Sequence, residues 1–366
     1  MRGDIKRKRS KLGKAAEALR KKAKDIHEYE VIRMPEERRL FLRDLVRETL
    51  IYESEYERAS RLKEQLVREF EGTPLHRAIP GQEVSNAYGS CYCIVDECFT
   101  QFKKAEYEKS KQLIMSNLKL VNGIGPVWET KLKQHGYHTI EDLKNHSRWR
   151  HPANELLKMI EINDVGSLQN WLWRYLPKSH PLAHYLAGFC KEEDFAILDI
   201  ETLGLFGRPI ILLGIARPRN NKICVNQFLL RDISDETGAL WEFVSQFDEN
   251  TALITFNGRA FDVPFIQERL SFYGMDASLD NPHFDLLHFA RRAWRDQLPN
   301  CRLETIEKYL GIHRDVDVPG ALVPEFYETY LKTQNVGTLV AIVEHNKQDL
   351  LTLATLFSKL YETWNL

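Results

Sequence analysis

The chain has 366 residues, of which 43% are hydrophobic and 28% charged, with 51 Lys and Arg against 52 Asp and Glu. This length allows two or three domains with substantial cores. No stretch approaches the roughly 18 apolar residues that span a bilayer, and no apolar segment follows the charged start, so a membrane or secreted protein is excluded and a cytoplasmic location is expected.

Charge is distributed unevenly along the chain. Residues 191–366 carry a net charge of −9 and residues 1–190 a net charge of +8. Eleven Lys and Arg fall within residues 1–24, which we expect to form a basic arm that attracts phosphates or aids solubility. The asymmetry favours a protein that binds a polyanion with one half and concentrates cations with the other, although two solvated surfaces would give the same sums.

Residues 25–110 predict a helical region with a small strand pair, and their role is left open. The apolar spacing over 35–71 predicts an amphipathic helix, and residues 75–100 predict strand, turn and strand. Three cysteines without a CxxC pair predict buried thiols or, with a fourth ligand from elsewhere, a zinc or iron–sulfur site; they are Cys91, Cys93 and Cys98.

A helical domain is predicted over residues 111–176. One helix is expected to end at Asn122-Gly123 and a second to begin at Gly125-Pro126, which exposes N–H groups that favour a phosphate. This stretch resembles the helix-hairpin-helix module, whose Gly-Ile-Gly turn grips nucleic-acid backbone without reading bases. The resemblance assigns nucleic-acid binding to Gly123, Ile124, Gly125 and Lys131. A helix pair without a ligand is the alternative.

Two further helices are predicted over 152–162 and 165–176. A linker is expected at 177–181, and the main domain boundary is placed near it.

The apolar run 195–204 predicts a buried strand that contains two carboxylates, Asp199 and Glu201. Side chains alternate along a strand, so both project from one face. Burying two like charges is costly unless cations neutralise them. The pair therefore predicts a divalent-metal site, or else solvated acids at a strand end.

The next elements predict a sheet with helices. Strands are expected over 209–216 and 223–230, then a helix over 235–247 and a strand over 251–256. Asp262 stands early in the helix that follows, where the helix dipole alone could favour a carboxylate. In the last predicted helix, 336–364, His345 and Asp349 are four residues apart and can face one site.

Together these residues resemble the three motifs of DEDD-superfamily exonucleases. The amino-acid sequence between the motifs, including residues 283–292, 303–311 and 317–320, resembles the YprB-type ribonuclease-H-like family. The motifs are Asp199-x-Glu201, Asn257-x-x-x-Phe261-Asp262 and His345-x-x-x-Asp349, in that order. The superfamily usually has Tyr at this last spacing, and His with one more residue before Asp. The resemblance implies an α/β fold: a ribonuclease-H-like mixed sheet flanked by helices over 190–366, preceded by a mainly α-helical nucleic-acid-binding region.

The resemblance also implies a mechanism. Asp199, Glu201, Asp262 and Asp349 would hold two Mg²⁺ or Mn²⁺ ions, which prefer oxygen ligands. His345 would take the proton of the attacking water or orient that water, unless it is only a rim residue. Asn257 and Phe261 would contact the terminal nucleotide, or belong to the core.

The expected function is a metal-dependent 3′→5′ exonuclease on single-stranded or frayed DNA or RNA. A ribonuclease-H-type endonuclease and a non-catalytic nucleic-acid-binding protein are the alternatives. Nucleic acid is the expected partner, and neither a membrane nor an organic cofactor is expected.

Overall fold

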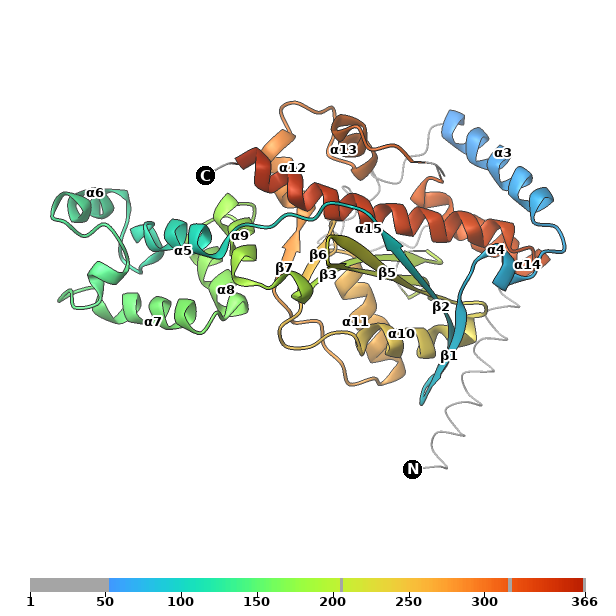
Figure 1. Cartoon of the computed structure of the whole chain (residues 1–366), viewed down its shortest axis with the longest axis horizontal. Helices are drawn as coiled ribbons and strands as arrows, with labels where there is room; N and C mark the ends of the chain where they lie inside the picture. Colours follow the sequence, from blue (N-terminus) through green and yellow to red (C-terminus); the bar gives the residue numbers. More distant parts are fainter. Residues whose placement is uncertain (1–52, 205–206, 315–317, 365–366) are drawn as a thin grey trace.

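The computed structural model describes residues 53–204, 207–314 and 318–364. A seven-stranded mixed sheet with the order β1-β2-β5-β4-β3-β6-β7 forms its centre (Figure 1). The strands are β1 (Gln82–Asn86), β2 (Gly89–Cys98), β3 (Phe195–Thr202), β4 (Ile210–Arg219), β5 (Lys222–Leu229), β6 (Ala252–Thr255) and β7 (His283–Asp285). Helices cover both faces of the sheet, which confirms the predicted α/β class and ribonuclease-H-like mixed sheet. The predicted basic arm, 1–24, lies outside the described residues.

The three central strands β3, β4 and β5 form an antiparallel meander. β3 pairs antiparallel with β4, and β4 pairs antiparallel with β5. On the other side, β6 pairs parallel with β3, and β7 pairs parallel with β6. Helices connect these parallel strands, as parallel pairing requires. β3 is therefore an interior strand, as its apolar sequence predicted.

Alternate residues of β3 enter two different cores. Ala196 and Leu198 pack in one hydrophobic cluster, while Phe195 and Ile197 pack in the other. Asp199 and Glu201 continue the face of Phe195 and Ile197, because side chains repeat every two residues along a strand. The sequence period thus places both carboxylates on one face of a central strand.

Helices form a layer on each face of the sheet. The long helix α15 (Gly337–Trp364) crosses one face and contacts β3, β4 and β5, while α10 (Glu236–Val244) and α11 (Asp262–Tyr273) lie on the opposite face (Figure 1). Gly214 of β4 allows α15 to approach closely, because a Cβ at this position would lie 2.2 Å from the Asn346 side-chain oxygen. The remaining helices of this part are α3 (Glu53–Glu69), α4 (Leu75–Ala78), α12 (Leu286–Trp294), α13 (Leu303–Leu310) and α14 (Val323–Thr333).

The strand pair predicted within residues 75–100 belongs to the main sheet. β2 pairs antiparallel with β5 along seven residues, and β1 forms the edge. Cys91 and Cys93 are buried on β2, and burial raises the pKa of the Cys91 thiol to about 12. These cysteines are therefore core residues. Strands β1 and β2 extend the ribonuclease-H-like sheet beyond β5.

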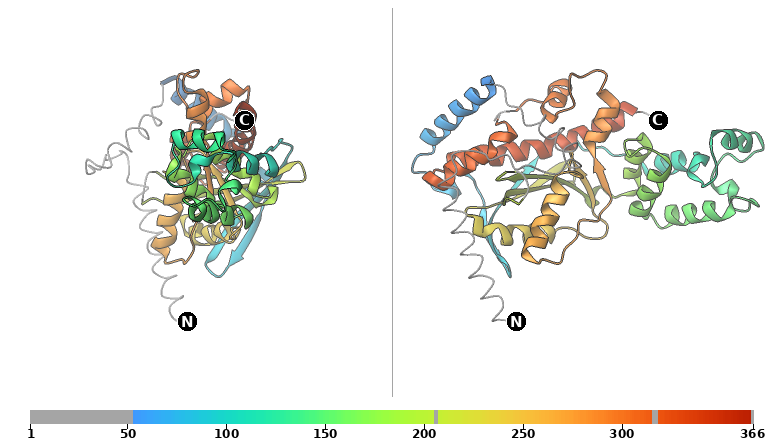
Figure 2. Two further views of the ribbon diagram at one scale, coloured as in Figure 1. Left: turned by 90° about the vertical axis from the view of Figure 1, so that its left-hand side faces the viewer. Right: turned by 180° about the vertical axis from the view of Figure 1, so that it is seen from behind.

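The helices between β2 and β3 stand at one end of the sheet, beyond β7 (Figures 1 and 2). They are α5 (Tyr107–Met115), α6 (Pro126–Gln134), α7 (Arg150–Glu161), α8 (Val165–Tyr175) and α9 (Pro181–Tyr185). The side chain of Gln169 on α8 pairs with both backbone polar groups of His283, at N···O distances of 3.1 and 3.0 Å. This contact covers the edge strand β7 and attaches the helical region to the sheet.

The first half of the predicted hairpin differs from expectation. The helix expected to end at Asn122 ends as α5 at Met115, and only a short 3-10 turn, Leu118–Leu120, precedes the glycines. The second helix begins at Pro126 as predicted, with Gly125 as its N-cap. Leu118 and Leu120 are both fully buried, so core packing fixes this segment without a regular α-helix. Among the helices described, none is long and apolar enough to cross a membrane.

Candidate active site

Four carboxylates from three elements face one another at the centre of the sheet. Asp199 and Glu201 come from β3, Asp262 is the first residue of α11, and Asp349 lies in the middle of α15. The Glu201, Asp262 and Asp349 residues are buried. The structure therefore brings together the acids that the sequence placed in one site, although 150 positions of chain separate the first from the last.

Burial and mutual repulsion raise the pKa values of Asp199, Glu201 and Asp262. Burial raises the pKa of Asp199 well above its ordinary value, and the negative charges of Asp349, Glu201 and Asp262 raise it further. Burial raises the pKa of Glu201, the charges of Asp349 and Asp262 raise it further, and the charge of Arg314 opposes them. Burial raises the pKa of Asp262 to about 7. Such a group of acids attracts positive charge.

The positive charge that the structure supplies is an arginine that the sequence did not single out. The guanidinium of Arg314 donates hydrogen bonds to Asp349 and to Glu307 of α13, and its Nη1 lies 3.2 Å from Nδ1 of His345. Only 9% of the Arg314 side chain is exposed. Arg314 precedes α14 in a loop without regular periodicity, so no pattern in the sequence indicated its position.

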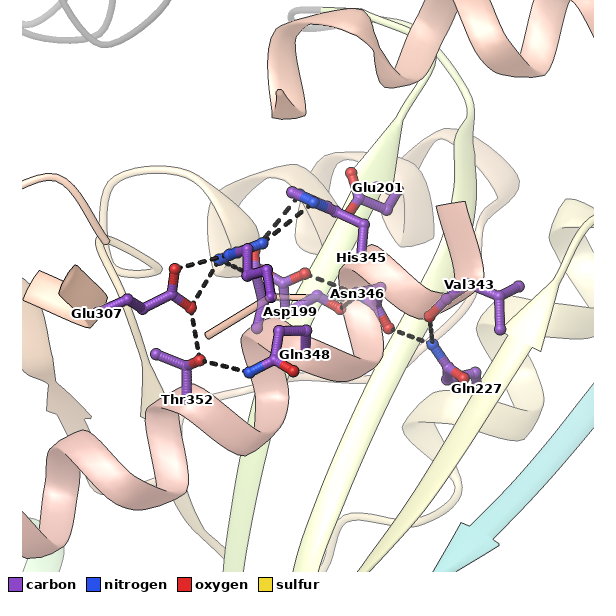
Figure 3. A network of polar contacts seen from close by, with 11 residues as sticks. Asp199, Glu201, Gln227, Glu307, Val343, His345, Asn346, Gln348 and Thr352 are labelled. Carbon is purple, nitrogen blue, oxygen red and sulfur yellow. Dashed lines mark hydrogen bonds and ion pairs between the residues drawn. The ribbon is translucent and has the colours of Figure 1, made fainter. Parts of the chain in front are cut away.

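Two further residues fix Asp199. Asn346 of α15 donates from Nδ2 to Oδ2 of Asp199 at 2.7 Å and to its backbone oxygen at 3.1 Å. Gln227 of β5 in turn donates to the Asn346 side-chain oxygen at 2.9 Å and to the Val343 carbonyl at 2.8 Å (Figure 3). Asn346 is fully buried, as its helical spacing with Leu339, Ile342 and Leu350 indicates. A buried amide needs a polar partner, so this spacing was the available signal in the sequence.

His345 faces the carboxylates with one ring nitrogen. Its Nε2 lies 3.6 Å from Oδ2 of Asp349 and 3.8 Å from Oε1 of Glu201. Burial lowers the pKa of His345, although the charge of Asp349 opposes this and that of Arg314 adds to it. Figure 3 shows His345 beside Glu201, and near them the hydrogen bonds that link Asp199, Asn346 and Gln227.

The donor set fits a hard divalent cation in its chemistry. Carboxylate oxygens are the ligands that Mg²⁺ and Mn²⁺ prefer, and a cation would relieve the repulsion that raises the pKa values. As the side chains stand, no group of three or more His, Cys, Asp or Glu among the described residues is arranged to hold a metal ion. Asp349 is engaged by Arg314 and Asp199 by Asn346, so a bound ion requires these carboxylates to turn.

Asn257 and Phe261 lie in the loop that leads to Asp262. Asn257 has a positive φ of 64°, and its backbone N–H donates to Oδ1 of Asp285 at 2.8 Å. Phe261 is half-buried and packs against Phe265, with ring centroids 5.5 Å apart. Both residues are thus close to Asp262 in the chain, and each has a structural role of its own.

The residues assigned to the hairpin lie in the helical region, apart from the carboxylates. Gly123 has a positive φ of 85°, and Gly125 is exposed at the start of α6. Lys131 is exposed, with its ammonium 5.3 Å from the centre of the Trp128 ring. Ile124 is only 5% exposed, so its side chain belongs to the core and only its backbone is placed for a ligand.

Comparison with known proteins agrees with this architecture. Residues 196–361, which include all four carboxylates and His345, match the model of the RNase H superfamily. The chain is also 37% identical over 192 residues to an uncharacterized protein, YprB, of Bacillus subtilis (strain 168). That alignment covers 51% of this chain and 46% of the relative, so the chain spans about half the length of that protein. This match and the seven-stranded mixed sheet together support a ribonuclease-H-like domain over residues 196–361.

Proposed function

We propose that the protein is a divalent-metal-dependent nuclease that acts as a 3′→5′ exonuclease on single-stranded or frayed nucleic acid. The observation that carries this proposal is the convergence of Asp199, Glu201, Asp262 and Asp349 within a ribonuclease-H-like domain. The order of these acids along the chain, and the position of His345 before Asp349, resemble exonuclease motifs.

Each residue has a defined part in this proposal. The four carboxylates would hold two Mg²⁺ or Mn²⁺ ions, which when bound about 4 Å apart supply an activated water and stabilise the leaving oxygen. Asn346 and Gln227 hold Asp199 in position through amide hydrogen bonds. Asn257 and Phe261, which precede Asp262 in the chain, would contact the terminal nucleotide.

The helical region would hold the substrate strand. Gly125 and the first residues of α6 are exposed, and Lys131 lies in the last turn of the same short helix. Arg148 lies 5.4 Å from the Trp128 ring centre, on the same cluster of aromatic and basic side chains as Lys131. Positive charge beside aromatic rings is suited to a polynucleotide backbone and its bases.

A panel of end-labelled substrates tests the proposal. Single- and double-stranded DNA and RNA, labelled at either end, and a circular single strand are incubated with Mg²⁺ or Mn²⁺ and, separately, with a chelator. We expect linear strands to shorten from the 3′ end with release of mononucleotides, and the circle to stay intact. Cleavage of the circle would identify an endonuclease, and tight binding without cleavage under every condition would identify a binding protein; either result contradicts the exonuclease.

A substitution at the hairpin tests the part of the helical region. Lys131→Ala should weaken binding to single-stranded nucleic acid by roughly tenfold, because a hydrogen bond to a charged group contributes about 1.5–3 kcal/mol. It should also reduce the slope of log K against log salt concentration by about 0.7, the value for one phosphate contact on a single strand. Fluorescence anisotropy at four salt concentrations measures both quantities.

The matched control is Lys158→Ala on α7, which removes an exposed lysine that the hairpin resemblance does not include. Gly125→Ala is a second test variant of the hairpin. A Cβ at Gly125 meets no atom within 4 Å, so the fold should persist, while the added methyl group keeps the backbone away from the phosphate. Equal affinity and equal salt dependence for wild type, Lys131→Ala and Gly125→Ala would exclude the hairpin as a contact.

A further inference from the structure

The guanidinium of Arg314 is held in place from outside the group of four carboxylates. Its Nε and Nη2 donate to the two oxygens of Glu307 at 2.6 and 2.9 Å, a paired arrangement that fixes the plane of the group. Glu307 is 2% exposed and also accepts a hydrogen bond from the Thr352 hydroxyl of α15 at 2.6 Å. Figure 3 shows Glu307 and Thr352 side by side in this network. Arg314 is therefore anchored whether or not Asp349 accepts from it.

This anchor directs the remaining donors of Arg314 at two residues of one helix. Nη2 donates to Oδ1 of Asp349, and Nη1 lies 3.2 Å from Nδ1 of His345. An arginine side chain offers only N–H donors and no acceptor. Nδ1 of His345 must therefore be the acceptor in this contact, and it carries no proton.

The position of the proton on His345 follows from this. A neutral imidazole carries one proton, and the hydrogen bond at one ring nitrogen decides which nitrogen bears it. With Nδ1 accepting from Arg314, the proton lies on Nε2, which faces Glu201 and Asp349 at 3.8 and 3.6 Å. Both separations exceed a direct hydrogen bond, so the proton on Nε2 is not committed to either carboxylate.

We propose that Arg314 is a positioning residue that holds His345 in the Nε2–H tautomer, so that His345 donates a hydrogen bond to an oxygen of the reacting groups and does not take the proton of the attacking water. The catalytic part of this statement rests on the proposed nuclease function. Of the two catalytic roles that the sequence left open for His345, taking the proton of the attacking water or orienting that water, the proposal favours the second. It also assigns a role to Arg314, which the sequence did not indicate.

Nitrogen NMR of the histidine rings tests the tautomer without metal or substrate. The protein is labelled with ¹⁵N-histidine, and the signal of His345 among the 12 histidines is assigned by its absence in His345→Asn. We expect wild type to show a single neutral form of His345 with the proton on Nε2. In the double variant Glu307→Gln/Arg314→Met, which removes both buried charges of the anchored pair, this single form should be lost to a mixture of both tautomers.

Lys308→Gln is the matched control. Lys308 is an exposed cation on α13 next to Glu307 and takes no part in the hydrogen bonds of Arg314, so its replacement should leave the His345 signal unchanged. A wild-type ring with its proton on Nδ1, or with protons on both nitrogens, would overturn the proposal, and so would a double variant whose His345 spectrum equals that of wild type. Absence of cleavage by wild type would refute the nuclease function and leave the tautomer result standing, so the two failures are distinguishable.

Discussion

Asp199→Asn and Asp349→Asn should each reduce the rate of phosphodiester hydrolysis by more than about 100-fold. Removing a residue that only orients a metal ligand costs up to about 100-fold in activity, and these two residues are proposed to be ligands themselves. Asparagine keeps the shape of the side chain and an oxygen that can accept from Asn346 or Arg314. It removes the negative charge that a divalent cation needs. Initial rates on an end-labelled single strand with Mn²⁺ measure the effect.

The fold should survive both substitutions. Burial and the charges of Asp349, Glu201 and Asp262 raise the pKa of Asp199, so Asp199→Asn removes a disfavoured charge and should not lower the melting temperature of the metal-free protein. In Asp349→Asn the buried Arg314 keeps its paired hydrogen bonds to Glu307. Asp296→Asn is the matched control, because Asp296 is exposed beyond the end of α12. Wild-type rates in either site variant, purified in the same way as the control, would show that these carboxylates are not the catalytic group.

Asp262→Asn should stabilise the metal-free protein increasingly as the pH rises. The pKa of Asp262 is about 7 in the folded protein, against an ordinary value of 3.8. Between these values the unfolded chain has released the proton and the folded protein still holds it, so the free energy of unfolding of wild type falls as the pH rises through this range. The difference between variant and wild type should therefore grow by about 4 kcal/mol from pH 4 to above pH 7.

Urea unfolding at several pH values in the presence of a chelator measures this difference. The exposed acid Asp296, replaced by Asn, provides the control and should give a curve parallel to that of wild type. Addition of Mg²⁺ or Mn²⁺ at pH 8 should stabilise wild type more than Asp262→Asn, because binding to the folded state adds stability. A constant difference between Asp262→Asn and wild type at every pH would show that burial does not hold this carboxyl protonated.

The sequence predicted those parts of the fold that repeat with a local period. The apolar alternation of β3 placed Asp199 and Glu201 on one face, and the spacing of His345 and Asp349 placed them on one side of α15. These predictions depend only on the geometry of a strand and a helix. The pairing of β2 with β5 could not be predicted in this way, because it joins segments more than 120 residues apart and depends on register between them.

Arg314, Glu307 and Gln227 show the same limit at the site. Each is an ordinary polar residue in its own segment, and its role arises only from a partner on another element: Arg314 from Asp349, Glu307 from Thr352 and Gln227 from Asn346. A buried polar group needs a hydrogen-bond partner, but the amino-acid sequence around it does not identify that partner. The motif resemblance identified the four acids that we propose as catalytic, whereas the residues that orient them were found only from the structure.

The central claim is that these four acids hold divalent cations against a phosphodiester. Anomalous diffraction from crystals of the wild-type protein grown with Mn²⁺ tests it most directly. We predict two Mn²⁺ peaks about 4 Å apart, coordinated by Asp199, Glu201, Asp262 and Asp349, with none at this place in Asp199→Asn crystals. Crystals that contain Mn²⁺ elsewhere or nowhere, with Asp349 still paired to Arg314 at saturating metal, would contradict it.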